Sequence, residues 1–154
     1  MQTFLPVPNF VESAKILDYR RLGKQRVEAD QIYKILTGQS TGNAWKNHPA
    51  VLMWKGYEDA LLHYRNEMIG EWVFRGYNNT MKYIIPSKKP VYPDWLGNKA
   101  FHASHRANLL RKDYTFYSSY RWREDVNMPY YWPTKPYKFK EYIYKNNKLE
   151  FLGC

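Results

Sequence analysis

A run of apolar residues at helical spacing constrains this chain more than any other feature. It opens at Asn47-His48-Pro49, where proline suits the first position of a helix, and it ends before Gly76. The apolar positions lie mostly three or four residues apart, as one face of a helix requires: Val51, Trp54, Tyr57, Leu61, Met68, Trp72 and Val73. We therefore predict one long amphipathic helix here, with Trp54 and Tyr57 in the core.

Shorter helical patterns precede this segment. One begins at Asn9, a good N-cap residue, and extends to about Leu17. A second covers residues 27–36 and stops at Gly38. Because Gly23 interrupts the region between them, either one kinked helix or two separate helices fits the pattern.

The second half of the chain is less regular. Three prolines over residues 84–97 predict an ordered but irregular crossing. A further helix is predicted from Asn98 to Lys112. Beyond Asp113 aromatic residues crowd together, and no clean helical period continues.

The C-terminal residues have the pattern of a β-hairpin. Rings and charges alternate over residues 137–145, and Asn146-Asn147 separates this run from residues 148–152. We therefore expect a helical domain over residues 1–133 and a β-hairpin appendage over residues 134–154.

The composition excludes two classes of protein. Aromatic side chains make up 18% of the 154 residues, and so many rings bury enough surface to offset the ordering entropy that keeps a chain disordered. No stretch approaches the roughly 20 apolar residues of a membrane-spanning helix. The first residues also lack a signal peptide's basic flank and cleavage site, so we expect a cytoplasmic protein. The only cysteine, Cys154, forbids an intramolecular disulfide and a cysteine-based zinc site.

The charge of the chain suggests an anionic partner. Its 24 Lys and Arg exceed its 14 Asp and Glu, giving a net charge of +10. Positive charge together with abundant flat rings favours nucleic acid, although a merely soluble basic protein has the same balance. The densest basic cluster surrounds Gly23 and consists of Arg20, Arg21, Lys24 and Arg26. If a helix restarts there, its free N–H groups add to a phosphate site, and the alternative is a solvated basic turn.

A carboxylate lies within this basic cluster. Glu28 is four residues after Lys24, on the same side of a helix. It is a candidate general acid or base, or a group that stabilises a developing positive charge. The alternative is an ordinary ion pair along the helix, worth a few tenths of a kcal/mol.

The histidines form a second candidate surface. His102, Ser104, His105 and Asn108 lie close together on one predicted helix and suit hydrogen bonds to phosphate or to base edges, with Lys112 adding charge. The alternative for either histidine alone is a structural role. His48, before the long helix, is also free to face a ligand. No spacing supports a metal site, and no nucleotide-cofactor motif is present, so we expect neither metal nor cofactor.

The N-terminal amine is a further candidate nucleophile. An α-amino group has a pKa of about 7.8, so its unprotonated fraction at neutral pH exceeds that of an ordinary lysine by more than a factor of about 100. The apolar, proline-containing stretch from Phe4 to Pro8 can anchor this amine against the body of the protein.

Several segments together form a recognisable series: Met1–Pro6, Leu17–Glu28, His48–Ala50, Met53-Trp54, Phe101-His102, Ser104–Arg106 and Leu109–Asp113. They resemble a bacterial and phage branch grouped with the pyrimidine-dimer DNA glycosylases of the endonuclease V type. The likeness extends over roughly residues 1–133. It implies a mainly α fold: a compact helical domain in which an N-terminal arm is inserted between helices at the active site, here with a small C-terminal β-hairpin.

The resemblance also implies a mechanism. In the family the N-terminal amine attacks the sugar C1′ of a damaged nucleotide, forms a Schiff base, and cuts the strand by β-elimination. A glutamate after the Tyr-Arg pair supports the cationic intermediate, and here Arg21 holds that place. Glu28 is the expected substitute, with Glu12 and Asp18 as lesser alternatives. Because Gln2 is bulky, Met1 is expected to be retained and to supply the amine.

These observations lead to one main hypothesis and two alternatives. The main hypothesis is a DNA glycosylase, with or without AP-lyase activity, that acts on damaged or modified pyrimidines in DNA through Met1 and Glu28. The alternatives are a non-catalytic nucleic-acid-binding protein and an enzyme acting on a small nucleotide or sugar phosphate. DNA is the expected partner, a membrane is not, and the sequence indicates no protein partner.

Overall fold

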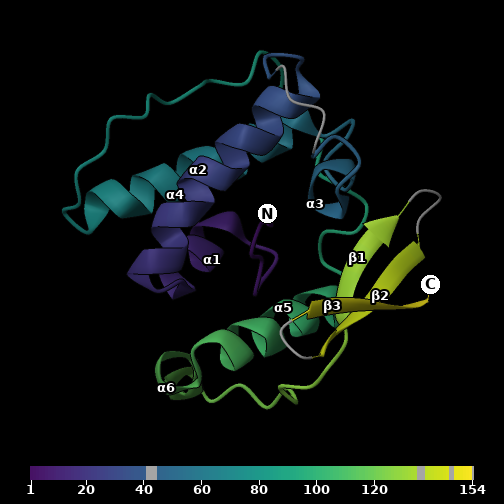
Figure 1. The fold of residues 1–154 in the computed structure, drawn as a ribbon. Helices are drawn as coiled ribbons and strands as arrows, with labels where there is room; N and C mark the ends of the chain where they lie inside the picture. The colour runs from purple at the N-terminus through teal and green to yellow at the C-terminus, as the bar shows by residue number, and fades with distance from the viewer. Residues whose placement is uncertain (41–44, 135–137, 146–147, 154) are drawn as a thin grey trace. The chain divides into compact units, whose positions relative to one another are not determined.

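The protein is mainly α-helical, as predicted (Figure 1). The computed structural model describes residues 1–40, 45–134, 138–145 and 148–153, and from residue 134 onward it describes the backbone alone. The helices are α1 (Phe10–Ile16), α2 (Tyr19–Leu36), α3 (Pro49–Leu52), α4 (Glu58–Phe74), α5 (Lys99–Lys112) and α6 (Tyr114–Tyr117), with a 3₁₀ turn, η1 (Ser118–Tyr120). The strands are β1 (Tyr130–Thr134), β2 (Lys138–Lys145) and β3 (Lys148–Gly153).

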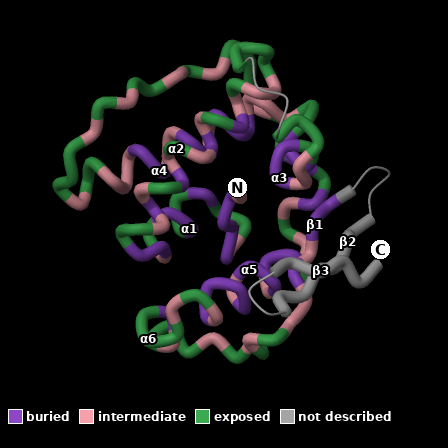
Figure 2. Tube along the Cα trace, in the orientation of Figure 1, coloured by how far each residue is buried: buried purple, intermediate pink, exposed green. Residues whose placement is uncertain are grey.

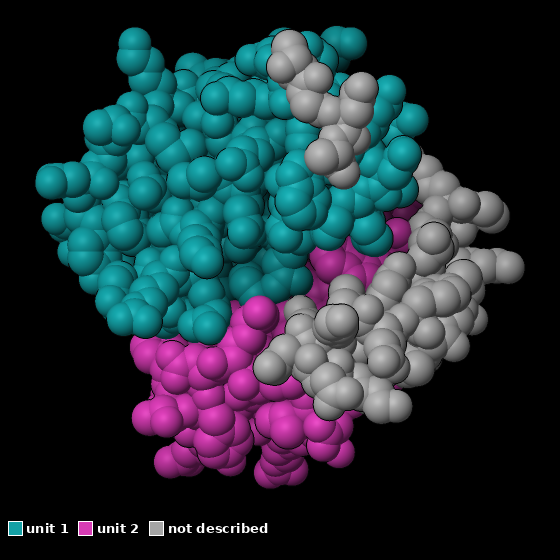
Figure 3. Space-filling view, viewed as in Figure 1, with its two compact units in different colours: residues 1–4, 9–93 teal, residues 5–8, 94–154 magenta. Residues whose placement is uncertain are grey.

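The chain forms two compact units (Figure 3). The first consists of residues 1–4 and 9–93, and the second of residues 5–8 and 94–154. The N-terminal arm therefore contributes residues to each unit, because the chain changes units after Phe4 and again after Pro8.

Helices α1, α2 and α4 build the first unit. Helix α2 packs along α4, and α1 also packs against α4. The buried positions of α2 are Leu22, Gln25, Ala29 and Ile32, which the helical period places on one face. In Figure 2 buried segments alternate with exposed ones along both long helices, as expected for helices with one face in a core.

Helix α2 passes through Gly23 without a break, which corrects the expected interruption there. The helix begins earlier, at Tyr19, where the Asp18 carboxylate accepts a hydrogen bond from the backbone N–H of Arg21. Gly23 instead provides space, because a Cβ at this position would lie 2.9 Å from Cζ3 of Trp72 on α4. The predicted stop at Gly38 is confirmed, with φ +76° just past the helix end.

The predicted long helix is wrong in one respect, because it is divided into α3 and α4. The predicted start at Pro49 is confirmed. Helix α3 ends at Leu52, turns follow it, and Gly56 takes a left-handed φ of +89° that a helix cannot continue through. The backbone N–H of Gly56 donates to Glu58 Oε1 at 3.1 Å, so the first turn of α4 stabilises the break. Trp54 is fully buried, as predicted, and Tyr57 is half-buried.

The second unit contains α5, α6, η1 and a three-stranded antiparallel sheet in the order β1-β2-β3. Helix α5 begins after the N-cap Asn98 and ends at Lys112, as predicted. Strands β2 and β3 confirm the two arms of the expected hairpin, whereas its turn at residues 146–147 lies outside the described residues. The short helical turns α6 and η1 correct the expectation of irregular structure after Asp113.

Strand β1 is not expected from the sequence, because Pro129 precedes it and Pro133 lies within it. Proline is tolerated at the edge of a sheet, where its missing N–H costs no ladder bond, and β1 is an edge strand in this sheet. It pairs with β2 from Tyr130 opposite Tyr142 to Thr134 opposite Lys138. The domain boundary expected after residue 133 therefore falls inside a strand.

Candidate active site

The first four residues are fixed within the first unit by polar contacts from α2, α4 and the turn after α3. The backbone N–H of Phe4 donates to Gln25 Oε1 at 2.9 Å, and the indole N–H of Trp54 donates to Thr3 Oγ1 at 3.0 Å. The Tyr64 hydroxyl lies 2.8 Å from the carbonyl oxygen of Phe4 and 2.6 Å from Gln25 Oε1. Thr3 and Phe4 are buried, so the N-terminal arm is an inserted segment, as the fold prediction requires.

Glu28 lies beside the N-terminal residue. Its Oε2 atom accepts two hydrogen bonds of 3.2 Å, one from the backbone N–H of Gln2 and one from Gln25 Nε2. Within the described part of the chain, Glu28 Oε1 has no hydrogen-bond partner and the Met1 amine has neither a hydrogen bond nor an ion pair. Burial, and secondarily the negative charge of Glu28, raise the pKa of Tyr64 well above its ordinary value, so Tyr64 remains a neutral donor.

His48 lies within electrostatic reach of the same amine. It is the N-cap of α3, where its Nδ1 accepts a hydrogen bond of 3.0 Å from the backbone N–H of Ala50. Burial lowers the pKa of His48, and the positive charge of the N-terminal amine lowers it further. The first unit therefore holds a neutral imidazole, a carboxylate and an amine around the start of the chain.

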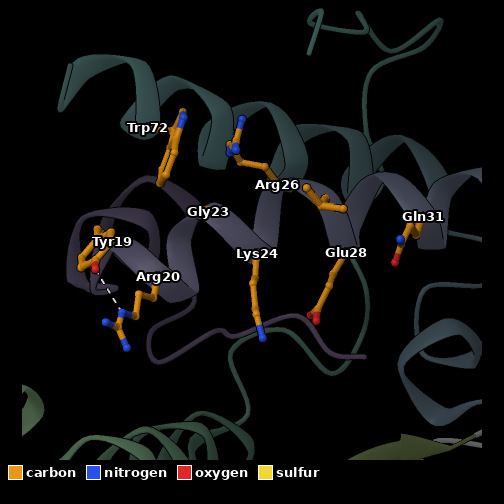
Figure 4. Close-up of a pocket in the computed structure, with 9 residues that line it drawn as sticks. Tyr19, Arg20, Gly23, Lys24, Arg26, Glu28, Gln31 and Trp72 are labelled. Carbon is orange, nitrogen blue, oxygen red and sulfur yellow. Dashed lines mark hydrogen bonds between the residues drawn. The ribbon is translucent and has the colours of Figure 1, made fainter. Parts of the chain in front are cut away.

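Arg20, Lys24 and Glu28 follow one another at four-residue intervals on α2. Figure 4 shows Lys24 and Glu28 extending to the same side of α2, whereas Arg26 extends to the other side, where Trp72 of α4 lies. Lys24 makes no ion pair or hydrogen bond with any described residue. An open hollow of about 490 Å³ lies over this part of α2 and is lined by Tyr19, Arg20, Gly23, Lys24, Arg26, Val27, Glu28, Gln31 and Trp72.

The comparison with family models agrees with this geometry. The model described as pyrimidine dimer DNA glycosylase matches residues 1–85, more than half of the chain and the segment that contains the inserted arm, Glu28 and His48. The protein belongs to the pyrimidine dimer DNA glycosylase family. No curated protein and no solved structure matches the chain.

Membership in the pyrimidine dimer DNA glycosylase family makes DNA the substrate and identifies the protein as a DNA glycosylase. Among the residues that the structure describes, no group of three or more His, Cys, Asp or Glu side chains is arranged to hold a metal ion. The described helices include none that is long and apolar enough to cross a membrane.

The basic cluster of this glycosylase divides into two sets. Arg20 and Lys24 are exposed beside Glu28, whereas Arg21 is half-buried and pairs with Asp18 at 3.3 Å. Arg26 donates to Asn79 Oδ1 at 2.8 Å, and its guanidinium lies 4.3 Å from the ring centre of Trp72. The phosphate site expected at a helix restart is therefore corrected, because α2 is continuous here and only side chains supply the charge.

The lesser carboxylate alternatives to Glu28 have other contacts. Glu12 is exposed on α1 and lies 3.9 Å from Lys15. Asp18 is the N-cap of α2 and pairs with Arg21. Each carboxylate therefore has a role at its own helix, Glu12 on α1 and Asp18 at the start of α2.

The predicted surface on α5 is buried, which corrects the expectation that its side chains face DNA. His102, Ser104, His105 and Asn108 are all at most 2% exposed, whereas Lys112 at the end of the helix is exposed. Ser104 Oγ donates to the carbonyl oxygen of Phe101, and Asn108 Oδ1 accepts from Arg111. Buried positions with local hydrogen bonds of this kind are typical of structural polar residues, although Asn108 Nδ2 and His105 Nε2 have no hydrogen-bond partner among the described residues.

The two histidines of α5 instead bind the backbone of the arm. His105 Nδ1 accepts from the N–H of Leu5 at 2.9 Å, and His102 Nδ1 lies 2.7 Å from the carbonyl oxygen of Leu5. His102 Nε2 accepts from the N–H of Gly97, so the proton of this imidazole is on Nδ1 and is donated to Leu5. Arg106 donates to the carbonyl oxygen of Pro6 at 2.8 Å.

Three residues of the site were not identified from the sequence as polar contacts of the arm: Gln25, Tyr64 and Trp54. Gln25 carried a usable signal, since it is a polar residue at a position where the helical period of α2 places apolar neighbours. Tyr64 and Trp54 carried none, because a ring at a core position is ordinarily interpreted as packing alone.

Proposed function

We propose that this protein releases a damaged or modified pyrimidine from DNA by attack of the Met1 α-amine on the sugar, and that it then acts as an AP lyase. The observation that carries the proposal is the 3.2 Å hydrogen bond from the backbone N–H of Gln2 to Glu28, which holds the N-terminal residue beside a carboxylate. The unpaired amine and the unpaired Oε1 atom of Glu28 within the described residues supply the two groups that the reaction needs.

The chemistry proceeds in three steps. The unprotonated Met1 nitrogen forms a bond to C1′ while the glycosidic bond breaks, and the base leaves with that bonding pair and takes a proton. The sugar ring opens as the nitrogen forms a C=N bond with C1′ and O4′ takes a proton, which gives a Schiff base. Loss of a proton from C2′ then expels the 3′ phosphate, and water hydrolyses the imine to restore the amine.

Glu28 stabilises the cations along this path. Positive charge develops on the sugar during base release and remains on the protonated Schiff base. A carboxylate beside the N-terminal residue stabilises both of these cations. Arg20 and Lys24, on the same side of α2, hold the phosphates next to the reacting nucleotide. His48 is neutral at neutral pH because its pKa is lowered, and its one acceptor nitrogen, Nδ1, is taken by the Ala50 N–H, so we assign it no proton transfer.

Borohydride trapping tests this function. The protein is incubated with duplexes that contain abasic sites, cyclobutane dimers or modified pyrimidines, and is then reduced. We expect a covalent adduct with at least one substrate, and no adduct after acetylation of the N-terminal amine. If every duplex binds without adduct or base release, the protein is a non-catalytic DNA-binding protein and the proposal fails.

Substitution of two glutamates distinguishes the proposed role of Glu28 from a general charge effect. Glu28→Gln keeps the size and the hydrogen-bonding groups of the side chain, and we expect turnover to fall by roughly 100-fold or more at nearly unchanged DNA affinity. Glu12→Gln is the matched control on the surface of α1, and it should retain turnover. Equal turnover in the two variants would show that Glu28 takes no part in the mechanism.

A further inference from the structure

Three aromatic rings form a continuous contact at one end of the hollow on α2. The ring centres of Tyr19 and Tyr77 are 6.1 Å apart, and those of Tyr77 and Trp72 are 4.4 Å apart, with interplanar angles of 31° and 32°. We call these three side chains the ring ladder. Tyr19 is 49% exposed and Tyr77 is 40% exposed, so two of the rings present large areas to solvent.

Cations flank the ring ladder on both ends. The Arg20 guanidinium lies 5.7 Å from the ring centre of Tyr19 and donates to the Tyr19 hydroxyl at 3.0 Å. The Arg26 guanidinium lies 4.3 Å from the ring centre of Trp72. Rings with a guanidinium group at each end match the two parts of a nucleotide, since a base stacks on a ring and a phosphate pairs with a guanidinium.

The third ring of the ladder, that of Trp72, has a fixed position. Trp72 donates its indole N–H to the carbonyl oxygen of Asn78 at 2.7 Å, and its ring rests against the backbone of α2 at Gly23 (Figure 4). The backbone N–H of Tyr77 also bonds to the carbonyl oxygen of Trp72. A platform that is already ordered loses little conformational entropy when a ligand stacks on it.

We propose that the ring ladder is a stacking platform for an unpaired DNA base that flanks the reacting nucleotide. Tyr19 and Glu28 are nine residues apart on α2, which corresponds to about 13 Å at 1.5 Å per residue. One DNA strand advances about 3.4 Å per nucleotide, so the platform reaches a base up to about four nucleotides from the reacting one. The substrate class is therefore DNA in which the bases next to the lesion are unpaired or easily unstacked.

This inference rests on the proposed function for the position of the reacting nucleotide, but its test does not. The probes are an oligothymidylate of about eight nucleotides and an oligomer of the same length built from tetrahydrofuran (1′,2′-dideoxyribose) phosphate units, which have no base and no C1′ hydroxyl. The two carry the same number of phosphates, so a difference in affinity reports the bases alone. The oligothymidylate contains no damaged base and the tetrahydrofuran sugars cannot form an imine, so each probe binds without covalent chemistry.

We expect the wild-type protein to bind the oligothymidylate about 5- to 150-fold more tightly than the base-free oligomer, as stacking of one base predicts. Tyr19→Ala and Tyr77→Ala should each remove most of this preference while leaving the salt dependence of binding unchanged. Tyr19→Phe keeps the ring and should keep the preference. Tyr83→Ala is the matched control, because Tyr83 is 54% exposed and lies outside the ladder.

Two results would overturn the inference: equal affinity of the wild-type protein for both oligomers, or an unchanged preference in Tyr19→Ala and Tyr77→Ala. Its failure is distinguishable from failure of the proposed function. A covalent adduct on borohydride trapping, together with no preference for bases, would refute the stacking platform and leave the proposed function standing. A ring-dependent preference without any adduct would refute the proposed glycosylase chemistry and leave the platform standing.

Discussion

At the scale of single residues, the polar side chain of Gln25 organises the start of the chain. Its Oε1 atom accepts from the N–H of Phe4, and its Nε2 atom donates to Glu28. Gln25 is 1% exposed, so water cannot replace these bonds.

Gln25→Leu should therefore lower both stability and activity. It removes the Gln25 oxygen that accepts from the buried N–H of Phe4, and loss of a buried hydrogen bond costs about 1–3 kcal/mol of unfolding free energy. The Glu28 carboxylate also loses one of its donors, so the yield of trapped adduct should fall. Chemical denaturation and trapping measure the two effects. Gln39→Leu, at an exposed position after α2, is the control, and a loss of similar size there would argue against a specific role of Gln25.

Gly23→Ala tests the contact that the sequence could not predict. Alanine inside a helix is ordinarily more stable than glycine by about 0.5–1 kcal/mol. Here the added Cβ would lie 2.9 Å from the Trp72 ring, so we expect the melting temperature to fall and the contact with Tyr77 to loosen. Gly70→Ala on α4 is the matched control, since the nearest atom to its Cβ is 3.8 Å away, and it should be stabilising. A stabilising Gly23→Ala would contradict the packing.

At the scale of secondary-structure elements, the sequence predicts those helix ends that neighbouring residues determine. The cap Asn9, the helix start near Asn98, the first-turn Pro49 and the stop at Gly38 are all predicted, because each depends on neighbouring residues. The role of Gly23 inside α2 is not predicted, since the ring that needs its space belongs to Trp72, 49 residues away in the chain. Strand β1 is missed for a similar reason: its pairing with β2 is not visible in a segment that follows one proline and contains another.

The candidate site followed the same pattern. The roles of Met1, Glu28 and the basic residues of α2 stay predictions, whereas the histidines of α5, which the sequence predicts as a DNA surface, are buried. Sequence spacing indicates which side chains share a helix face, but it does not indicate whether that face is covered. Here the arm residue Leu5 bonds with His102 and His105, and both imidazoles are buried.

Because these two imidazoles of α5 are buried, we expect the unfolding free energy of the protein to depend on pH. Burial lowers the pKa of His105 well below its ordinary value, and the charges of His102 and Arg106 lower it further. Burial also lowers the pKa of His102, with the hydrogen bond to Leu5 opposing the shift and Arg106 adding to it. The unfolded chain then binds more protons than the folded one below a pH of about 6.5, so the unfolding free energy falls as the pH decreases from that value.

Thermal unfolding between neutral and mildly acidic pH checks this dependence. His105→Asn removes the titrating group, so its melting temperature should change less steeply below a pH of about 6.5 than that of the wild-type protein. His63→Gln, which removes the partly exposed imidazole beside Glu67 on α4, is the comparison variant. An unchanged slope in His105→Asn would mean that other groups cause the acid instability.

At the scale of the whole molecule, the net charge of +10 attracts DNA without selecting a site. Specific phosphate contacts are distinguished by their effect on the salt dependence of binding. Lys24→Gln should reduce the slope of log affinity against log salt by about one, because one phosphate contact is lost. Lys88→Gln removes an exposed charge outside the hollow and should leave the slope nearly unchanged. Equal slopes in both variants would show that Lys24 contributes only general charge.

The central claim is that the nucleophile is the Met1 amine, held beside Glu28. The most direct measurement is the identity of the modified residue after borohydride reduction on abasic DNA, proteolysis and mass spectrometry. We predict that the added mass lies on the peptide that begins at Met1, on its α-nitrogen. Lys24 is the informative competitor, because its amine lines the same hollow. An adduct on Lys24, with the N-terminal peptide unmodified, would contradict the account.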